Sequence, residues 1–269
     1  MPVTTPTNFF RRITPGIETV QSTFSLPRHR HMHAYASVVV AGSFVESGYI
    51  GRIHATEGDV LIHPELDCHA NRRVSAGLRL IRLDWSHRKP SSGFYRLGNE
   101  LDDLAKTAEK DPRDAAQLLE DALHQNQPSP GGVKDDWPDL LAEALTQDSS
   151  LAIGEWAHSN HLAQQTVSRG FSAVYGVAPE VFRAEARART AWLRVTHGSD
   201  CLCQIAAESG FADQAHMTRW IHRITGAPPG AWRNMCARSL TGPRINAASA
   251  TTSSDDSKPA AQRRPGRFR

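Results

Sequence analysis

The chain has 269 residues, a formal net charge of +3 and a mean hydropathy of −0.45. Its 39% hydrophobic and 22% charged residues are ordinary for a globular protein, and its length predicts two domains with flexible ends. No apolar run approaches the roughly 20 residues that cross a bilayer, and residues 1–12 lack the apolar core of a secretory signal. We therefore expect a cytoplasmic protein with no membrane partner. So small a net charge does not by itself predict binding to nucleic acid.

The cysteines are few and scattered, at Cys68, Cys201, Cys203 and Cys236. Cys201 and Cys203 lack a second pair at zinc-binding spacing, so the pattern predicts neither a disulfide framework nor a zinc finger. We expect reduced, mostly buried thiols.

The N-terminal part of the chain has the pattern of a small antiparallel β-domain. After a flexible N-terminus at residues 1–16, short alternating apolar segments broken by glycine and proline run over residues 17–94. Gly58-Asp59, which precedes an apolar run, predicts a hairpin turn.

The rest of the chain has helical periodicity. Residues 95–125 predict two helices separated at Asp111-Pro112, residues 126–136 are a hinge rich in proline and glycine, and residues 137–238 are helical almost throughout. Residues 239–269 contain too few apolar side chains to fold, which predicts a disordered basic tail. The expected fold class is therefore α+β multidomain, with an N-terminal β-barrel, a helical segment and an all-α C-terminal domain.

Two similar stretches occur inside the helical region. One runs from Ile153 to Pro179 and the other from Ile205 to Pro229. In a helix-turn-helix unit, a small residue on the first helix lets the second helix cross close to it, and Ala157 and Ala206 fit this role.

The turn and the cap of each unit can also be assigned. The turn requires a residue that accepts positive φ, which Gly210 supplies in the second copy and His161 supplies less favourably in the first. Asp213 is suited to cap the second helix of its unit. Between the copies we expect a helix from Pro179 to His197, ended by Gly198 and about 28 Å long. This length is near the ~34 Å between successive major-groove faces, so one chain has the reach to place two helices in adjacent grooves.

The segment 151–233 resembles the DNA-binding domain of the AraC/XylS family. Its second copy, IAAESGFADQAHMTRWIHRITGAPPGAWR, is similar to the family signature, and the departures include His161 in place of glycine and Gly170 inside the first recognition helix. The resemblance implies a non-enzymatic transcription regulator that binds double-stranded promoter DNA. The DNA-facing residues that it implies are Gln164, Gln165, Ser168, Arg169, Gln214, Ala215, Thr218 and Arg219. The alternative role for Arg169 and Arg219 is an ion pair within the protein.

The N-terminal domain resembles a cupin barrel, which AraC-type regulators often carry as a sensor. His29-x-His31-x3-Tyr35-x6-Gly42 is similar to the first cupin motif, and His69-x-Asn71 is loosely similar to the second. The resemblance implies a small-molecule effector at the barrel mouth. The candidate ligand-binding residues are His29, His31, Tyr35, His69, Arg79 and Arg82.

The same motif raises the question of a metal. Metal-binding cupins use a glutamate where this chain has Tyr35, although imidazoles from His29, His31 and His69 are suitable ligands for a transition metal. We expect these histidines to be partly exposed hairpin residues in a barrel with no metal and no cofactor. We expect no special role for His33 and His63.

The helical segment 95–125 resembles the region through which family members dimerise. Its apolar stripe consists of Leu101, Leu104, Leu118, Leu119 and Leu123. An intramolecular core is equally consistent with this stripe. We expect a homodimer, with RNA polymerase as a further partner.

Two other hypotheses compete with an effector-responsive regulator. The first is a constitutive DNA-binding regulator whose barrel is only a dimerisation scaffold. The second is a metal-dependent cupin enzyme joined to DNA-binding helices, which requires an open metal site.

Overall fold

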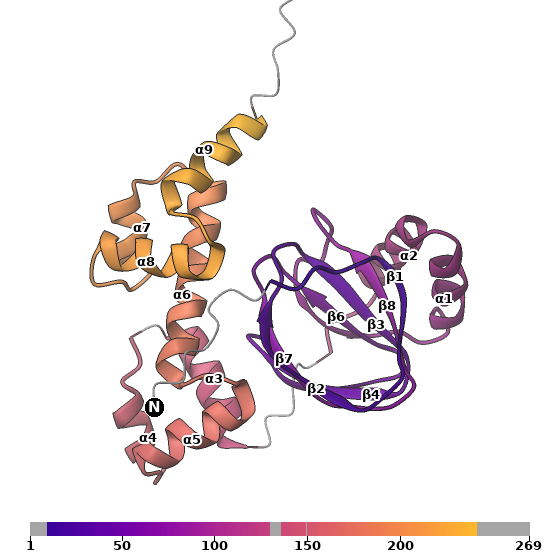
Figure 1. The fold of residues 1–269 in the computed structure, drawn as a ribbon, viewed down its shortest axis with the longest axis horizontal. Coiled ribbons are helices and arrows are strands. Elements are labelled where there is room, and N and C mark those ends of the chain that lie inside the picture. The colour runs from indigo at the N-terminus through magenta and orange to yellow at the C-terminus, as the bar shows by residue number, and fades with distance from the viewer. Residues whose placement is uncertain (1–9, 130–135, 149, 241–269) are drawn as a thin grey trace, which may run out of the picture.

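The computed structural model describes residues 10–129, 136–148 and 150–240 (Figure 1). Most of the predicted flexible N-terminus, most of the predicted hinge and nearly all of the predicted tail lie outside these residues. The described part contains an N-terminal domain of two sheets and a C-terminal column of helices, and these lie side by side. None of the described helices is long and apolar enough to span a membrane.

The N-terminal strands form two antiparallel sheets that face each other. The larger sheet has the order β1 (Gly16–Val20), β8 (Leu78–Asp84), β3 (Tyr35–Ala41), β6 (Asp59–His63), β9 (Gly93–Arg96). The smaller has the order β2 (Phe24–Arg30), β7 (Cys68–Val74), β4 (Ser43–Gly48), β5 (Gly51–Thr56). The predicted β-domain is thus confirmed, but as two sheets that no hydrogen-bonded ladder among the described residues closes into a barrel.

The turn at Gly58-Asp59 differs from the predicted hairpin. Gly58 has φ +85°, as a tight turn requires, but the strands on either side belong to different sheets. β5 pairs with β4, whereas β6 pairs with β3 and β9. The sequence therefore predicted the turn correctly and the pairing wrongly, because pairing depends on strands distant in the chain.

Two helices, α1 (Leu101–Lys110) and α2 (Pro112–Gln125), cover the outer face of the larger sheet (Figure 1). The predicted break at Asp111 is confirmed, and its carboxylate accepts a hydrogen bond from the Arg113 backbone N–H at 2.7 Å. Leu104, Leu119 and Leu123 are buried in the core beneath these helices.

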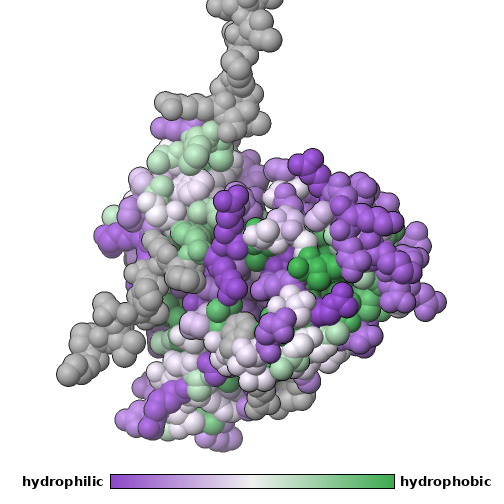
Figure 2. All heavy atoms as spheres, turned by 45° about the vertical axis from the view of Figure 1, so that its right-hand side comes forward, coloured by the Kyte–Doolittle hydropathy of each residue, from purple (hydrophilic) through white to green (hydrophobic). Residues whose placement is uncertain are grey.

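Most of the predicted dimerisation stripe therefore packs into the core of the same chain. Leu101 is half-buried against the same core, and only Leu118, 37% exposed, is a large apolar side chain at the surface. The side of the molecule on which α1 and α2 lie is largely hydrophilic (Figure 2). The buried leucines thus provide no face for a second copy.

The C-terminal helices are arranged around one long helix. In chain order they are α3 (Trp137–Gln147), α4 (Ile153–Ser159), α5 (Gln164–Tyr175), α6 (Pro179–His197), α7 (Leu202–Glu208), α8 (Gln214–Thr225) and α9 (Pro229–Leu240). The α4–α5 and α7–α8 pairs lie toward opposite ends of α6 (Figure 1). Cys201 and Cys203 are exposed at the start of α7, so the prediction of mostly buried thiols is wrong for this pair.

Candidate functional site

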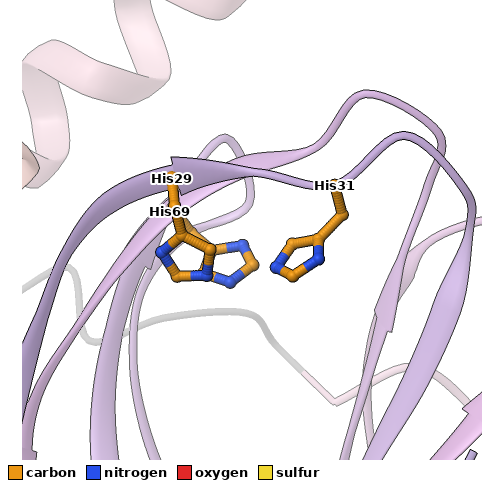
Figure 3. Close-up of side chains that lie close together, drawn as sticks. All are labelled: His29, His31 and His69. Carbon is orange, nitrogen blue, oxygen red and sulfur yellow. The ribbon is translucent and has the colours of Figure 1, made fainter. Parts of the chain in front are cut away.

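The histidines of the N-terminal domain converge between the two sheets. His29 on β2 is the cross-strand partner of His69 on β7, and His31 follows directly after β2 (Figure 3). The ring centroid of His29 lies 4.9 Å from that of His31 and 4.6 Å from that of His69. All three side chains are buried, so the expectation of partly exposed hairpin histidines is wrong. The alternation of β2 turns His29 and His31 toward the interior together.

Two of these imidazoles have one nitrogen engaged in a short hydrogen bond. His69 Nδ1 donates to Asp67 Oδ2 at 2.9 Å, and His29 Nδ1 donates to the Pro27 carbonyl at 2.9 Å. Both nitrogens of His31 are buried without a hydrogen-bond partner in the described structure. Burial lowers the pKa of His29 to about 3 and that of His31 to about 2, so both rings are neutral near pH 7.

Acidic groups that the sequence analysis did not predict adjoin the histidines. Burial would raise the pKa of Asp67, but hydrogen bonds from His63 and His69 outweigh it and hold that pKa well below its usual range. Burial would lower the pKa of His69, but Glu46 and Asp67 raise it. One oxygen of Glu46, Oε1, is buried without a hydrogen-bond partner among the described residues. His63, for which no role was expected, thus belongs to this network.

The remaining predicted ligand contacts divide into two groups. Tyr35 is buried, with its hydroxyl 3.3 Å from His69 Nε2, and Arg82 faces the same cavity while it donates to Glu18 at 2.7 Å. Arg79 lies on the outer face, where its nearest ion-pair partner is Glu109 at 3.8 Å. The assignment of Arg79 to the ligand set is wrong. Leu78, Leu80 and Arg82 of β8 line the cavity, and successive side chains of a strand point to opposite faces, so Arg79 points away from it.

The space around these residues has two parts. A cavity of about 30 Å³, roughly the share of one water in liquid, lies between the sheets and is lined by the three histidines, Tyr35 and Glu46. A cleft of about 510 Å³ beside it shares His31 and Tyr35 and is also lined by the segment that begins at Phe10. The cleft and the cavity are thus adjacent, with His31 and Tyr35 between them.

The two helical pairs of the C-terminal domain have the same turn. The Leu162 backbone N–H donates to the Ala157 carbonyl at 2.9 Å, and the Phe211 N–H donates to the Ala206 carbonyl at 3.0 Å. His161 has φ +56° and Gly210 has φ +73°. Both predicted turn residues are confirmed, and the two small alanines, Ala157 and Ala206, are buried. The Asp213 carboxylate accepts from the His216 backbone N–H, which confirms the predicted cap.

The second helix of each pair buries one face and exposes the other. Val167 and Phe171 on α5, and Met217 and Ile221 on α8, are buried in separate cores. The predicted DNA-facing residues are exposed except for Thr218, which is half-buried; they are Gln164, Gln165, Ser168, Arg169, Gln214, Ala215, Thr218 and Arg219. Neither arginine of this set forms an ion pair with any residue that the structure describes. Two polar helix faces are therefore free to meet a partner.

A helix-turn-helix domain model in a scan of protein families matches residues 156–235. These residues are an AraC-type helix-turn-helix domain. The match confirms, over these residues, the helix-turn-helix resemblance inferred from the sequence.

Solved structures similar to the chain include the following three. ToxT from Vibrio cholerae, bound to an unsaturated fatty acid, is 10% identical over 82% of this chain and 94% of its own, with a TM-score of 0.36. The DNA-binding domain of AdpA in complex with a target DNA is 22% identical over 38% and 95%, with a TM-score of 0.35. The C-terminal domain of AraT, a response regulator from Geobacillus stearothermophilus, is 15% identical over 36% and 84%, with a TM-score of 0.34. Scores this low do not establish a shared arrangement, and a search of curated proteins gave no match.

The AraC-type domain contacts the N-terminal domain through a partly buried ion-pair cluster. Glu185 on α6 lies 3.0 Å from Arg28 and 3.4 Å from Arg30, measured from each guanidinium nitrogen Nη2 to Oε2. The Tyr49 hydroxyl donates to the same oxygen at 3.5 Å. Leu66, fully buried, packs into the core of the second helix-turn-helix unit. These contacts could not be predicted from local sequence patterns, since they join residues far apart in the chain.

Proposed function

We propose that this protein regulates transcription by binding a specific promoter sequence through both helix-turn-helix units, under the control of a small effector in the N-terminal domain. The observation that supports DNA binding best is the repeated turn, which leaves two exposed polar faces toward opposite ends of α6. Exposed polar side chains on such helices are what readout of base edges requires. The protein acts in the cytoplasm and is not an enzyme.

The proposed DNA contacts come from α5 and α8. Arg169 and Arg219 are the strongest candidates for base or phosphate contact, since arginine bonds guanine and phosphate in a bidentate manner. The other proposed contacts are Gln164, Gln165, Ser168, Gln214, Ala215 and Thr218. We further propose that the protein binds the promoter as a homodimer and contacts RNA polymerase there.

The proposed effector site lies between the two sheets. His29, His31, Tyr35, His69 and Arg82 surround it, and Arg79 is no longer included. Control by an effector is favoured over a constitutive regulator because β2 contributes to both this site and the contact with α6.

The test is a titration of the full chain with the duplex upstream of its own gene and with a scrambled duplex, at two salt concentrations. We expect the upstream duplex to bind at least about 10³-fold more tightly, as for specific DNA-binding proteins. Binding of both duplexes should weaken as salt rises. Equal affinity for the two duplexes at both salt concentrations would mean that the protein does not regulate the adjacent promoter by specific binding.

A further inference from the structure

We propose that His29, His31 and His69 bind one divalent transition-metal ion, and that this ion is the effector of the regulator. The inference rests on the proposed function, because it assigns a chemical class to the effector. The candidate ligand nitrogens lie within 4.8 Å of one another, and all three rings point into the same space (Figure 3). A tetrahedral ion with bonds of about 2.0 Å holds its nitrogens about 3.3 Å apart, so a small closing rotation of the rings completes the site.

The hydrogen bonds around the rings favour a metal. Imidazole ligands of metals usually donate their other N–H to a carboxylate or a backbone carbonyl, which fixes the tautomer. Asp67 has this role for His69, and the Pro27 carbonyl has it for His29, so each Nε2 is left as an acceptor. The Tyr35 hydroxyl meets His69 Nε2 only at 3.3 Å, a long hydrogen bond that an ion replaces.

His31 provides an independent observation. Its side chain is 2% exposed, and neither ring nitrogen has a hydrogen-bond partner among the described residues. Leaving a buried polar group without a partner is costly, and a bound ion removes that cost. The buried carboxylates of Asp67 and Glu46 nearby favour a positive charge, and the adjacent Arg82 is paired with Glu18.

The size of the space also fits an ion. The cavity of about 30 Å³ accommodates an ion or a water, and the larger cleft that shares His31 lies directly beside it. Three imidazole ligands suit zinc, nickel, copper or iron better than magnesium or calcium.

The ligands are connected directly to the DNA-binding domain. His29 and His31 alternate along the chain with Arg28 and Arg30, whose guanidinium groups meet Glu185 on α6. Arg30 also donates to the Leu66 carbonyl at 2.7 Å, and the His31 backbone N–H donates to the Asp67 carbonyl at 3.0 Å. An ion that moves the end of β2 therefore acts on α6, which carries both helix-turn-helix units.

The binding test uses the full chain after treatment with a chelator. Titration with Zn²⁺ in a calorimeter should give one tight site per chain. Loss of a residue that only hydrogen-bonds a metal ligand weakens metal binding by roughly 10–100-fold, so Asp67→Asn should weaken zinc binding by about this factor. His31→Gln removes a ligand itself and should weaken zinc binding by more. His54→Gln, at an exposed histidine on β5, is the matched control and should bind like the parent. No tight site in the parent, or equal binding by the His31 and His54 variants, would overturn the metal site.

The coupling test measures affinity for the upstream duplex with and without Zn²⁺. Zinc should change the affinity of the parent by at least about 5-fold, the lower end of ordinary allosteric coupling. Glu185→Gln should still bind zinc but lose this dependence. Specific DNA binding that ignores zinc would overturn the inference and leave the proposed function intact, whereas loss of specific binding in every condition would overturn the proposed function itself.

Discussion

At the scale of single residues, Gly170 shows why a helix-weakening residue stands inside a recognition helix. A Cβ placed on Gly170 would overlap the indole ring of Trp137, so the missing side chain is what lets α3 pack against α5. Glycine in a helix interior costs up to about 1 kcal/mol relative to alanine. The close packing of Trp137 offsets that cost.

The expected result of Gly170→Ala is a lower free energy of unfolding, by about 1–3 kcal/mol, because overpacking outweighs the gain in helix propensity. Urea denaturation measures it. Gly230→Ala on α9 is the matched control, since no atom lies within 4 Å of its added Cβ, and it should change stability by no more than about 1 kcal/mol. If Gly170→Ala is as stable as the parent or more so, Trp137 does not require the glycine.

At the scale of elements, the two recognition helices have the same length but differ in how they begin. The side chain of Asp213 caps α8, whereas Ala163 precedes α5 without a side-chain cap. Such a cap satisfies one backbone N–H that has no partner within the helix. The N-terminus of α5 is therefore less stabilised than the N-terminus of α8.

Exchanging the two cap types should shift stability in opposite directions. Asp213→Ala should lower the free energy of unfolding by about 0.5–2 kcal/mol, and Ala163→Asp should raise it by about 1 kcal/mol. Denaturation of both variants beside the parent provides the measurement. A shift of the same sign in both would show that capping does not determine these helix ends.

The sequence predicted those features that depend on neighbours in the chain. The turn at His161, the cap at Asp213 and the break at Asp111 were all predictable from local residue preferences. The burial of His31 and the contact of Glu185 with β2 were not, because strand register and domain packing bring together residues distant in the chain. The features that could not be predicted from local sequence patterns are therefore those that depend on long-range packing.

At the scale of the whole molecule, the contact between the domains depends on the charge of Glu185. Burial alone would raise its pKa, but Arg28 and Arg30 on β2 outweigh burial and lower it, with Arg223 on α8 adding to the effect. The Tyr49 hydroxyl also faces this carboxylate. A depressed pKa in the folded state means that the ionised form stabilises the fold.

This stabilisation should be complete above the ordinary carboxyl value of 4.5 and should be lost as the pH falls through the lower folded value. The free energy of unfolding, measured in urea at pH 7 and again below pH 4.5, should therefore fall more steeply for the parent than for Glu185→Gln. Identical pH dependence in the two proteins would mean that the ion pair contributes nothing to the contact between the domains.

We propose that one chain places two recognition helices in successive major grooves. The helix α6 between the two units has 19 residues and is therefore about 28 Å long. The most direct measurement is a hydroxyl-radical footprint of the full chain on its upstream duplex, run beside Arg169→Ala, Arg219→Ala and the control Arg113→Ala. We predict that each bound chain protects two segments about one helical turn, or about 10 base pairs, apart, with one of the two lost in each recognition-helix variant and both retained in the control. A single protected segment, or two that respond identically to both variants, would contradict the claim.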